Sequence, residues 1–337
     1  MFEMFPPALA LIGGALLTAL ISSRQLRAVV VIVAPLICLY LIWQVPDGVV
    51  VRGAFLGYPL ELVEGGPVRR LFATIFAIMS ATGAVFAFNH ARRTELVAAQ
   101  LYAAGAVGVS FAGDLLTLFV FWEIMALFST VVVWCGGTES ARAAGVRYAI
   151  MHLLGGVILK VGIEGLLVTT APPLSSWLSD AYPTASPTGS VFLSAFTTKT
   201  AILALILLFP GESILVGVGL FMVFYGIIYA LLENDIRRIL AFSIVNQVGF
   251  MVVAVGIGTE MAINGASAHA FAHIIYKALL FMSAGVVVMR TGKHLCTDVG
   301  GLFRTMPVTM WCGVIGALAI SSFPLTSGFT TKTLISQ

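Results

Sequence analysis

Long apolar runs set the fold class of this chain. Each run holds about 18 to 25 residues between charged or Pro/Gly-containing breaks, which lets a helix cross a hydrocarbon core about 30 Å thick. Hydrophobic residues make up 59% of the 337 residues and charged residues only 10%, far from the balance of a soluble domain. The runs lack the polar/apolar alternation of barrel strands. The sequence therefore predicts an all-α, polytopic transmembrane helix bundle.

The apolar runs predict about eleven transmembrane helices. Their approximate ranges are 8–23, 28–45, 70–89, 96–113, 115–135, 145–168, 188–209, 213–232, 238–257, 263–289 and 306–323. The first run follows an acidic start, whereas a signal peptide begins with positive charge, so we expect it to be retained as a span.

Two segments are too broken by proline and glycine for continuous helices. The stretch TTAPPLSSWLSDAYPTASPT carries four prolines, and the last run breaks at Pro324 and Gly328. In membranes, such interruptions occur where the backbone lines a polar cavity. We therefore expect discontinuous helices near 171–183 and 324–332.

Basic loops predict the orientation, because short loops rich in Lys and Arg stay in the cytoplasm. The first, third and fifth loops are basic, which places the N-terminus outside. Their basic residues are Arg24, Arg27, Arg92, Arg93, Arg142 and Arg147. The basic loops after residue 188 would then emerge outside, unless one more crossing lies between residues 168 and 188. We expect either a re-entrant segment there or an inverted second half.

Two opposite charges lie deep in apolar runs. Glu123, in FWEIMAL, lies roughly 13 Å along a helix from Asp114, and Lys199 is equally deep in the run 188–209. An acidic residue at the membrane centre costs about 2.5 to 3.5 kcal/mol. An ion pair between Glu123 and Lys199 is the expected compensation, and its simplest alternative role is to fix helix packing.

Further titratable residues follow in the later runs. His269, His273 and Lys277 recur at four-residue steps and so share one stripe of a helix. Histidine titrates near neutral pH, and intramembrane lysines mark proton and ion pathways. The stripe predicts a proton relay, to which Lys332 adds a cation just after the break at Pro324 and Gly328.

The sequence carries no sign of a bound cofactor. Cys38, Cys135, Cys296 and Cys312 lack metal-ligand spacing, and we expect them to have packing roles. No haem, iron–sulfur, phosphate-binding or Ser/His/Asp pattern is present in the sequence. We expect no cofactor, metal, disulfide or nucleic-acid partner.

Five motifs between residues 110 and 335 carry a family resemblance. They are GDLLTLFVFWEIMALFS, SSWLSDAYPTASPTGSVFLSAFTTKTAILAL, ENDIRRILAFSIVNQVGFM, HAFAHIIYKALLFMSAG and FPLTSGFTTK. In this order they resemble the proton-translocating antiporter-like subunits shared by respiratory complex I and Mrp-type sodium/proton antiporters, and the D-type Mrp subunit above all. The resemblance implies N-terminal transmembrane helices over 1–95 and an antiporter-like core over 96–337.

The resemblance also assigns roles to the buried charges. Glu123 matches the family's fifth-helix glutamate, Lys199 its eighth-helix lysine, and Lys332 the lysine of its discontinuous twelfth helix. The implied proton-translocation axis consists of Glu123, Lys199, His269, His273, Lys277 and Lys332. The implied partners are other membrane subunits of a cation/proton antiporter or complex I-like assembly in the cell (inner) membrane, with protons and a candidate Na⁺ as transported ions.

This chain departs from the family pattern in two places. TTAPPLSSWL follows the sixth span at once, where the family has a full intervening stretch, and the sequence ends at Gln337, before the family's last helices. The resemblance thus implies a core shortened relative to the 14-helix family fold and incomplete at its C-terminus.

Three functional hypotheses remain open at this point. The first is a proton-translocating subunit, which takes part in an NADH:quinone oxidoreductase reaction at most as a member of such a complex, without a redox site of its own. The second is a truncated, non-conducting structural subunit. The third, weaker hypothesis is a self-sufficient carrier for sodium or another ion.

Overall fold

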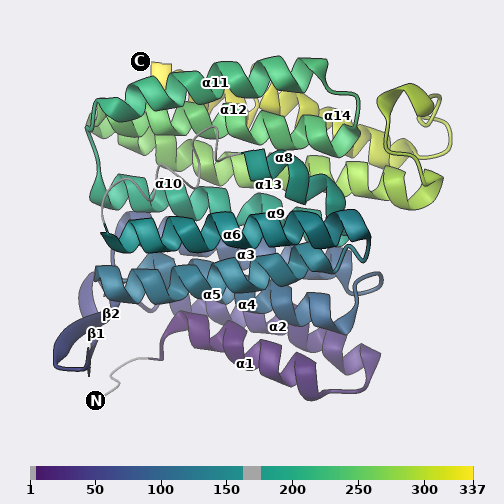
Figure 1. The fold of residues 1–337 in the computed structure, drawn as a ribbon. Coiled ribbons are helices and arrows are strands. Elements are labelled where there is room, and N and C mark those ends of the chain that lie inside the picture. The colour runs from purple at the N-terminus through teal and green to yellow at the C-terminus, as the bar shows by residue number, and fades with distance from the viewer. Residues whose placement is uncertain (1–4, 162–175, 337) are drawn as a thin grey trace. The chain divides into compact units, whose positions relative to one another are not determined.

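The computed structural model describes residues 5–161 and 176–336 (Figure 1). The chain divides into two compact units, Met1–Leu166 and Leu167–Gln337. The functional division expected at residues 95 and 96 stays a prediction.

The first unit is a bundle of antiparallel helices joined mostly by short turns (Figure 1). Its helices are α1 (Pro7–Leu20), α2 (Arg24–Ile42), α3 (Pro67–Ala87), α4 (Arg93–Phe111), α5 (Leu115–Trp134) and α6 (Glu139–Val161). Prolines begin α1 and α3, where the missing N–H has no intrahelical partner to lose. Helix α4 packs against α1, α3 and α5 and is buried along most of its length.

A β-hairpin between α2 and α3 is the element that the hydropathy pattern did not predict. Strands β1 (Gly48–Phe55) and β2 (Tyr58–Gly65) pair antiparallel, with Phe55 opposite Tyr58. The connecting Leu56 and Gly57 both have positive φ, as a two-residue type I′ hairpin turn requires. The hairpin fills the long gap between the second and third predicted spans.

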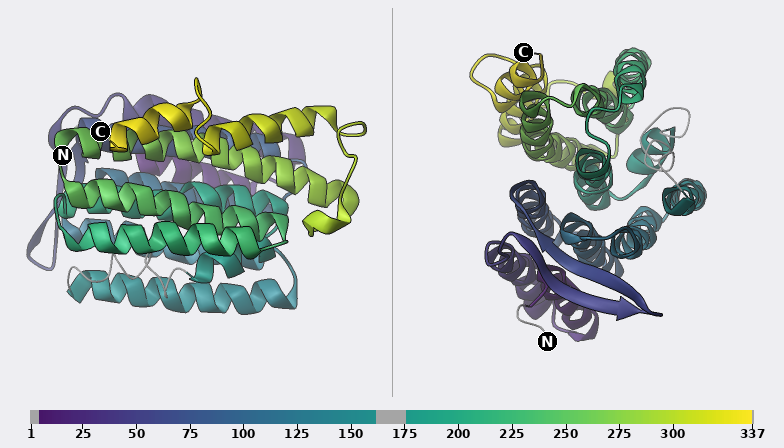
Figure 2. Two further views of the ribbon diagram at one scale, coloured as in Figure 1. Left: turned by 90° about the horizontal axis from the view of Figure 1, so that it is seen from above. Right: turned by 90° about the vertical axis from the view of Figure 1, so that its left-hand side faces the viewer.

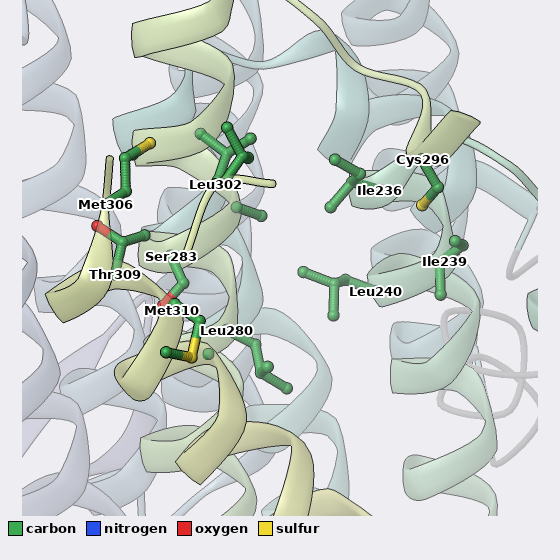
Figure 3. A pocket seen from close by; sticks show the side chains of 13 residues that line it. Ile236, Ile239, Leu240, Leu280, Ser283, Cys296, Leu302, Met306, Thr309 and Met310 are labelled. Atoms are coloured by element: carbon green, nitrogen blue, oxygen red, sulfur yellow. The ribbon is translucent and has the colours of Figure 1, made fainter. Parts of the chain in front are cut away.

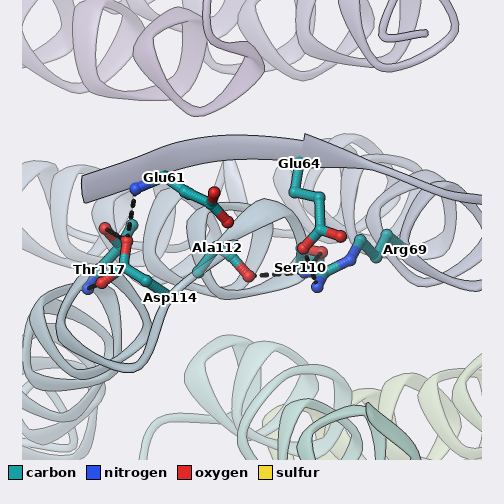
Figure 4. Close-up of polar contacts among 7 residues, drawn as sticks. All are labelled: Glu61, Glu64, Arg69, Ser110, Ala112, Asp114 and Thr117. Atoms are coloured by element: carbon teal, nitrogen blue, oxygen red, sulfur yellow. Dashed lines mark hydrogen bonds and ion pairs between the residues drawn. The ribbon is translucent and has the colours of Figure 1, made fainter. Parts of the chain in front are cut away.

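Asp114 fastens this hairpin to the α4–α5 turn (Figure 4). Its Oδ1 accepts hydrogen bonds from the backbone N–H groups of Leu116 and Thr117, both at 2.9 Å, and so caps α5. Its Oδ2 accepts from the Glu61 N–H at 2.8 Å and from the Thr117 hydroxyl at 2.6 Å. Burial raises the pKa of Asp114, but the bonds from Thr117, Glu61 and Leu116 outweigh it and hold the pKa below its ordinary value.

The second unit contains short, broken helices as well as long ones (Figure 2). Its elements are α8 (Ser176–Thr184), α9 (Pro187–Ala195), α10 (Thr197–Leu208), α11 (Ile214–Leu232), α12 (Ile236–Ile257), α13 (Glu260–Thr291), the 3₁₀ turn η1 (Cys296–Asp298), α14 (Pro307–Ile320) and α15 (Ser327–Ser336). Helix α13 is the centre of this unit and packs against α9, α10, α12, α14 and α15.

Helices α11 and α12 approach each other closely through glycines. A Cβ atom added to Gly249 would meet the Gly219 carbonyl oxygen at 2.7 Å, and one added to Gly226 would meet the Asn246 nitrogen at 2.4 Å. Small residues of this kind allow helix backbones to pack closely within a membrane. The glycines therefore hold α11, whose other faces expose large apolar side chains, against α12.

The predicted all-helical membrane fold is confirmed. Within the described ranges, every predicted span coincides with a helix or a helix pair, residues 162–168 of the sixth span lying outside those ranges, and 7 helical segments there are long and apolar enough to cross a membrane. The break expected near 324–332 lies between Ile320 and Ser327, so it includes Pro324, whereas Gly328 lies inside α15. Of the break expected near 171–183, residues up to 175 lie outside the described ranges, and α8 begins directly after them.

One predicted span is divided. The sequence predicted a continuous span over 188–209, but α9 ends at Ala195 and α10 begins at Thr197. Phe196, between them, has φ −96° and ψ −70°, which interrupts the regular helix. The local polar run SAFTTKT supplies hydroxyl groups that compete for backbone hydrogen bonds.

Candidate functional site

Titratable side chains line the interior of the second unit. Lys199 on α10 and His269, His273 and Lys277 on α13 are all 0% exposed. Helix α10 packs directly against α13, so these residues come from neighbouring elements. The structure thus brings four of the six predicted axis residues into the interior of one unit.

Lys199 is held at the break between α9 and α10. Its Nζ donates hydrogen bonds to the backbone carbonyl of Ser194 at 2.7 Å and to the Thr198 hydroxyl at 2.9 Å. Ser194 lies in the last turn of α9, where carbonyl groups lack intrahelical partners and carry partial negative charge. The break therefore provides a site for a cation.

Lys332 has an equivalent position in the second broken segment. Its Nζ donates to the carbonyl of Ile320, the last residue of α14, at 2.9 Å. The same ammonium group lies 5.6 Å from the centre of the Phe250 ring. Lys199 and Lys332 thus each bind a carbonyl group at the C-terminal end of a preceding half-helix.

The predicted stripe on α13 is present as one line of side chains. The ring centres of His269 and His273 are 6.1 Å apart, and Lys277 donates from its Nζ to the Ser243 hydroxyl on α12. Tyr276, which the four-residue spacing did not include, lies 5.2 Å from the His273 ring. Neither ring nitrogen of His273 has a hydrogen-bond partner among the described residues.

A pair of amides on α12 joins this stripe. The Gln247 Oε1 atom lies 3.2 Å from His269 Nε2 and accepts a hydrogen bond from the Tyr276 hydroxyl at 3.3 Å. Gln247 Nε2 in turn donates to Asn246 Oδ1 at 2.7 Å. Neither amide was predicted from the sequence, although a polar pair within the apolar run FSIVNQVGF was a signal that could have found them.

Helix α15 completes the polar cluster. Thr331 Oγ1 lies 2.8 Å from His269 Nδ1, on the side of the ring opposite Gln247. His269 therefore connects α12, through Gln247, with α15, through Thr331. Both interrupted segments of this unit, at Lys199 and at Lys332, thus adjoin the histidine-bearing helix.

Arg237 is a buried basic residue at the start of α12. Arginine side chains are mostly exposed in proteins, yet Arg237 is only 6% exposed. Its Nη1 donates to the Ala185 carbonyl at 2.8 Å, in the connection between α8 and α9. Arg237 therefore anchors α12 to the segment that leads to the Lys199 break.

Glu123 belongs to the first unit. It is half-buried on α5, and its Oε1 has no hydrogen-bond partner among the described residues. It borders a cavity of about 340 Å³ between α5 and α6, whose lining includes Thr130, Trp134 and Leu153. Because Glu123 and Lys199 lie in different units, the expected ion pair stays a prediction.

A further cavity, of about 420 Å³, lies between α12, α13 and α14 (Figure 3). Ile236, Leu240, Leu280 and Met310 are among its apolar lining residues, and no predicted axis residue lines it. Within the described ranges, no group of three His, Cys, Asp or Glu side chains is placed to hold a metal ion.

Curated relatives are similar to this chain in sequence. The D-type component of the Na(+)/H(+) antiporter of Alkalihalophilus pseudofirmus is 28% identical over 346 residues, covering 86% of this chain and 67% of that protein. The N-type component of the NADH-quinone oxidoreductase of Desulforudis audaxviator is 31% identical over 276 residues, covering 68% and 55%. The chain thus spans about half to two thirds of the length of these relatives.

Two solved structures share the fold. One is an archaeal respiratory complex, the membrane-bound sulfane sulfur reductase, with a TM-score of 0.86 at 23% identity over 98% of this chain and 79% of that chain. The other is the Mrp complex from Dietzia sp. DQ12-45-1b, with a TM-score of 0.86 at 22% identity over 98% and 42%.

A family model described as "NADH:quinone oxidoreductase/Mrp antiporter, TM" matches residues 165–337, just over half of the chain. This range contains the broken helices and the whole polar cluster of the second unit. The resemblance inferred from the motifs is confirmed: the chain is an antiporter-like membrane subunit and belongs to the NADH:quinone oxidoreductase/Mrp antiporter transmembrane family.

Proposed function

We propose that this chain moves protons across the membrane as a subunit of a multisubunit cation/proton antiporter or complex I-like assembly. The observation that carries the proposal is the cluster of buried Lys199, His269, His273 and Lys277 with the partly buried Lys332, all in one unit. Intramembrane ionisable groups are costly and are typical of proton relays. Helix packing alone does not require several proton-exchanging side chains in the interior of one unit.

The cluster offers an order for the transfer. Lys199 at the α9–α10 break lies on a helix packed against α13, whose His273 has two ring nitrogens without hydrogen-bond partners among the described residues. His269 follows on the same stripe and contacts Thr331, next to Lys332 at the second break. We infer that protons pass between the two breaks through these histidines, with Lys277 as a side branch held by Ser243.

Glu123 is proposed as the counter-charge of Lys199. A carboxylate whose Oε1 lacks a hydrogen-bond partner among the described residues is suited to a partner from elsewhere in the assembly or the chain. The relatives are named as components of an antiporter and of a quinone oxidoreductase. We propose other membrane subunits as partners, Na⁺ as the candidate coupled ion, the cell inner membrane as the location, and an N-terminus outside.

Proton flux in inverted membrane vesicles tests the proposal. The chain is expressed with its genomic neighbours, and wild type is compared with Lys199→Met, His273→Gln and Glu123→Gln. We expect each variant to lower flux by about tenfold or more, as loss of a proton-transfer group typically does. Lys293→Met is the matched control, because Lys293 is exposed and its Nζ donates to the Asp298 carbonyl, away from the cluster.

The amount of assembled complex in the membrane is measured for every variant. Lower flux at unchanged assembly supports the proposal. Unchanged flux in all three variants would contradict it and would identify a non-conducting structural subunit. Ion-driven exchange by this chain without its neighbours would indicate a self-sufficient carrier instead.

A further inference from the structure

We propose that Gln247 is a positioning residue that fixes the tautomer of His269. In this arrangement Nε2 of His269 permanently carries a hydrogen, and Nδ1, which faces Thr331 on α15, is the nitrogen that gains and loses the transferred proton. The inference deepens the proposed function. It rests on that function only in taking the proton on Nδ1 as one that crosses the membrane, because the tautomer of His269 is a property of the folded chain.

The first step is the orientation of Asn246. Its Nδ2 lies 2.9 Å from the backbone carbonyl oxygen of Val223 on α11. A carbonyl oxygen can only accept a hydrogen bond, so the Asn246 atom that faces it must be the NH₂ group. The Oδ1 atom of Asn246 is therefore directed to its other partner, Gln247.

The second step carries this orientation to Gln247. Asn246 Oδ1 can only accept, so the Gln247 atom at 2.7 Å must be the donor Nε2. Gln247 Oε1 then faces His269 Nε2 at 3.2 Å, and an amide oxygen requires a hydrogen on that nitrogen. The Tyr276 hydroxyl, which can donate or accept, donates to the same oxygen and is consistent with this orientation.

Burial makes the orientation strict. Asn246, Gln247 and Tyr276 are at most 7% exposed, and His269 is 0% exposed. With little competing water, a reversed amide would leave a buried donor facing a donor and a buried acceptor facing an acceptor. The carbonyl of Val223 therefore determines, through two amides, which nitrogen of His269 carries the fixed hydrogen.

The third step concerns Nδ1 and Thr331. Thr331 Oγ1 lies 2.8 Å from Nδ1 and 2.9 Å from the Ser327 carbonyl oxygen, and its hydroxyl has a single hydrogen. When His269 is neutral, that hydrogen points to Nδ1. When a proton binds Nδ1, the ring becomes a cation with both nitrogens donating, and the hydroxyl hydrogen turns to the Ser327 carbonyl. Release of the proton reverses the rotation, so hydrogens and charge balance.

Nitrogen-15 NMR of histidine-labelled complex in membranes tests this inference, because protonated and unprotonated ring nitrogens have well-separated shifts. The His269 signals are those lost in His269→Gln. At a pH where the ring is neutral, we expect the population of the Nε2–H tautomer to exceed that of the Nδ1–H tautomer by about tenfold or more. One buried hydrogen bond is sufficient for such a ratio. Gln247→Glu, whose carboxylate still accepts from Nε2–H, should keep this tautomer.

Two variants should change the tautomer. Gln247→Met removes the acceptor, and Asn246→Leu frees the Gln247 amide to turn over and donate to Nε2, which favours Nδ1–H. Thr331→Val should keep Nε2–H, since it removes only the partner of Nδ1, and Thr331→Ser is its hydroxyl-bearing control. An Nδ1–H tautomer in wild type, or Nε2–H unchanged in both Gln247→Met and Asn246→Leu, would overturn the inference. Neither readout depends on proton flux, so failure of the proposed function remains distinguishable.

Discussion

Replacement of Asp114 separates two tasks that its carboxylate performs at once. One oxygen caps α5, and the other binds the N–H of Glu61 in the hairpin and the Thr117 hydroxyl. Asp114→Ala removes all four hydrogen bonds. Loss of a helix cap costs about 0.5 to 2 kcal/mol, and hydrogen bonds to a charged group about 1.5 to 3 kcal/mol. Since such terms do not add fully, we expect a loss of about 2 to 4 kcal/mol in unfolding free energy.

Asp114→Asn is the more selective variant. The amide keeps an oxygen for the α5 cap but places an NH₂ group against the Glu61 N–H, so donor faces donor. We expect about 1 to 2 kcal/mol of destabilisation, confined to the hairpin. Detergent-induced unfolding measures the free energy, and limited proteolysis of residues 48–65 reports hairpin release. Asp298→Ala, at an exposed acidic position, is the control.

The same carboxylate predicts a pH dependence. Burial raises the pKa of Asp114, but the hydrogen bonds from Thr117, Glu61 and Leu116 outweigh it, so the folded pKa lies below the unfolded value of about 3.9. Its contribution is then complete above the unfolded pKa and is lost as pH falls through the folded pKa. The stability difference between wild type and Asp114→Asn should be constant near neutral pH and shrink in acid. A difference that is absent at neutral pH, or that grows in acid, would refute the reasoning.

Three further predictions concern other elements. Gly249→Val should lower the yield of folded protein severalfold, because its Cβ meets α11 backbone, whereas Gly217→Ala, with open space around its Cβ, should not; size-exclusion profiles in detergent measure this. Lys332→Met removes the bond to the Ile320 carbonyl and should lower proton flux without loss of assembly, and flux equal to wild type would count against a role for the second break. Exposed Cys296 follows the basic end of α13, and with a re-entrant segment before residue 188 it should react with an impermeant thiol reagent in inverted vesicles; reaction only in right-side-out vesicles would indicate the inverted second half instead.

Hydropathy and spacing were sufficient to predict the apolar spans and the stripe on α13, though not the division of the span 188–209. Apolar length is a direct consequence of bilayer thickness, and a four-residue step places side chains on one helix face whatever the neighbouring elements are. Pro324 and Gly328 likewise predicted an interruption, because proline removes a backbone donor. These features depend on local chemistry alone.

Features that depend on tertiary partners could not be predicted in this way. Asp114 holds the β1–β2 hairpin to the bundle, although it is distant from the hairpin in sequence. Its sequence neighbours indicate only an acidic residue in a loop. The interruption at Phe196 occurs within residues 190–209, which contain no proline or glycine. It is seen only in the folded chain, where Lys199 binds the Ser194 carbonyl. Gln247 belongs to the cluster because α13, which also packs against α15, places His269 beside it, and the sequence around Gln247 does not show this contact.

The two lysine-bound helix ends have a thermodynamic consequence. If the proton on Lys332 stabilises one position of the α14 end, then a change in that position must alter the affinity of Lys332 for its proton by the same factor. The same reciprocity applies to Lys199 and the end of α9. A neighbouring protein that displaced either helix end by a fraction of an ångström would therefore exchange mechanical work for proton binding, without touching the lysine itself.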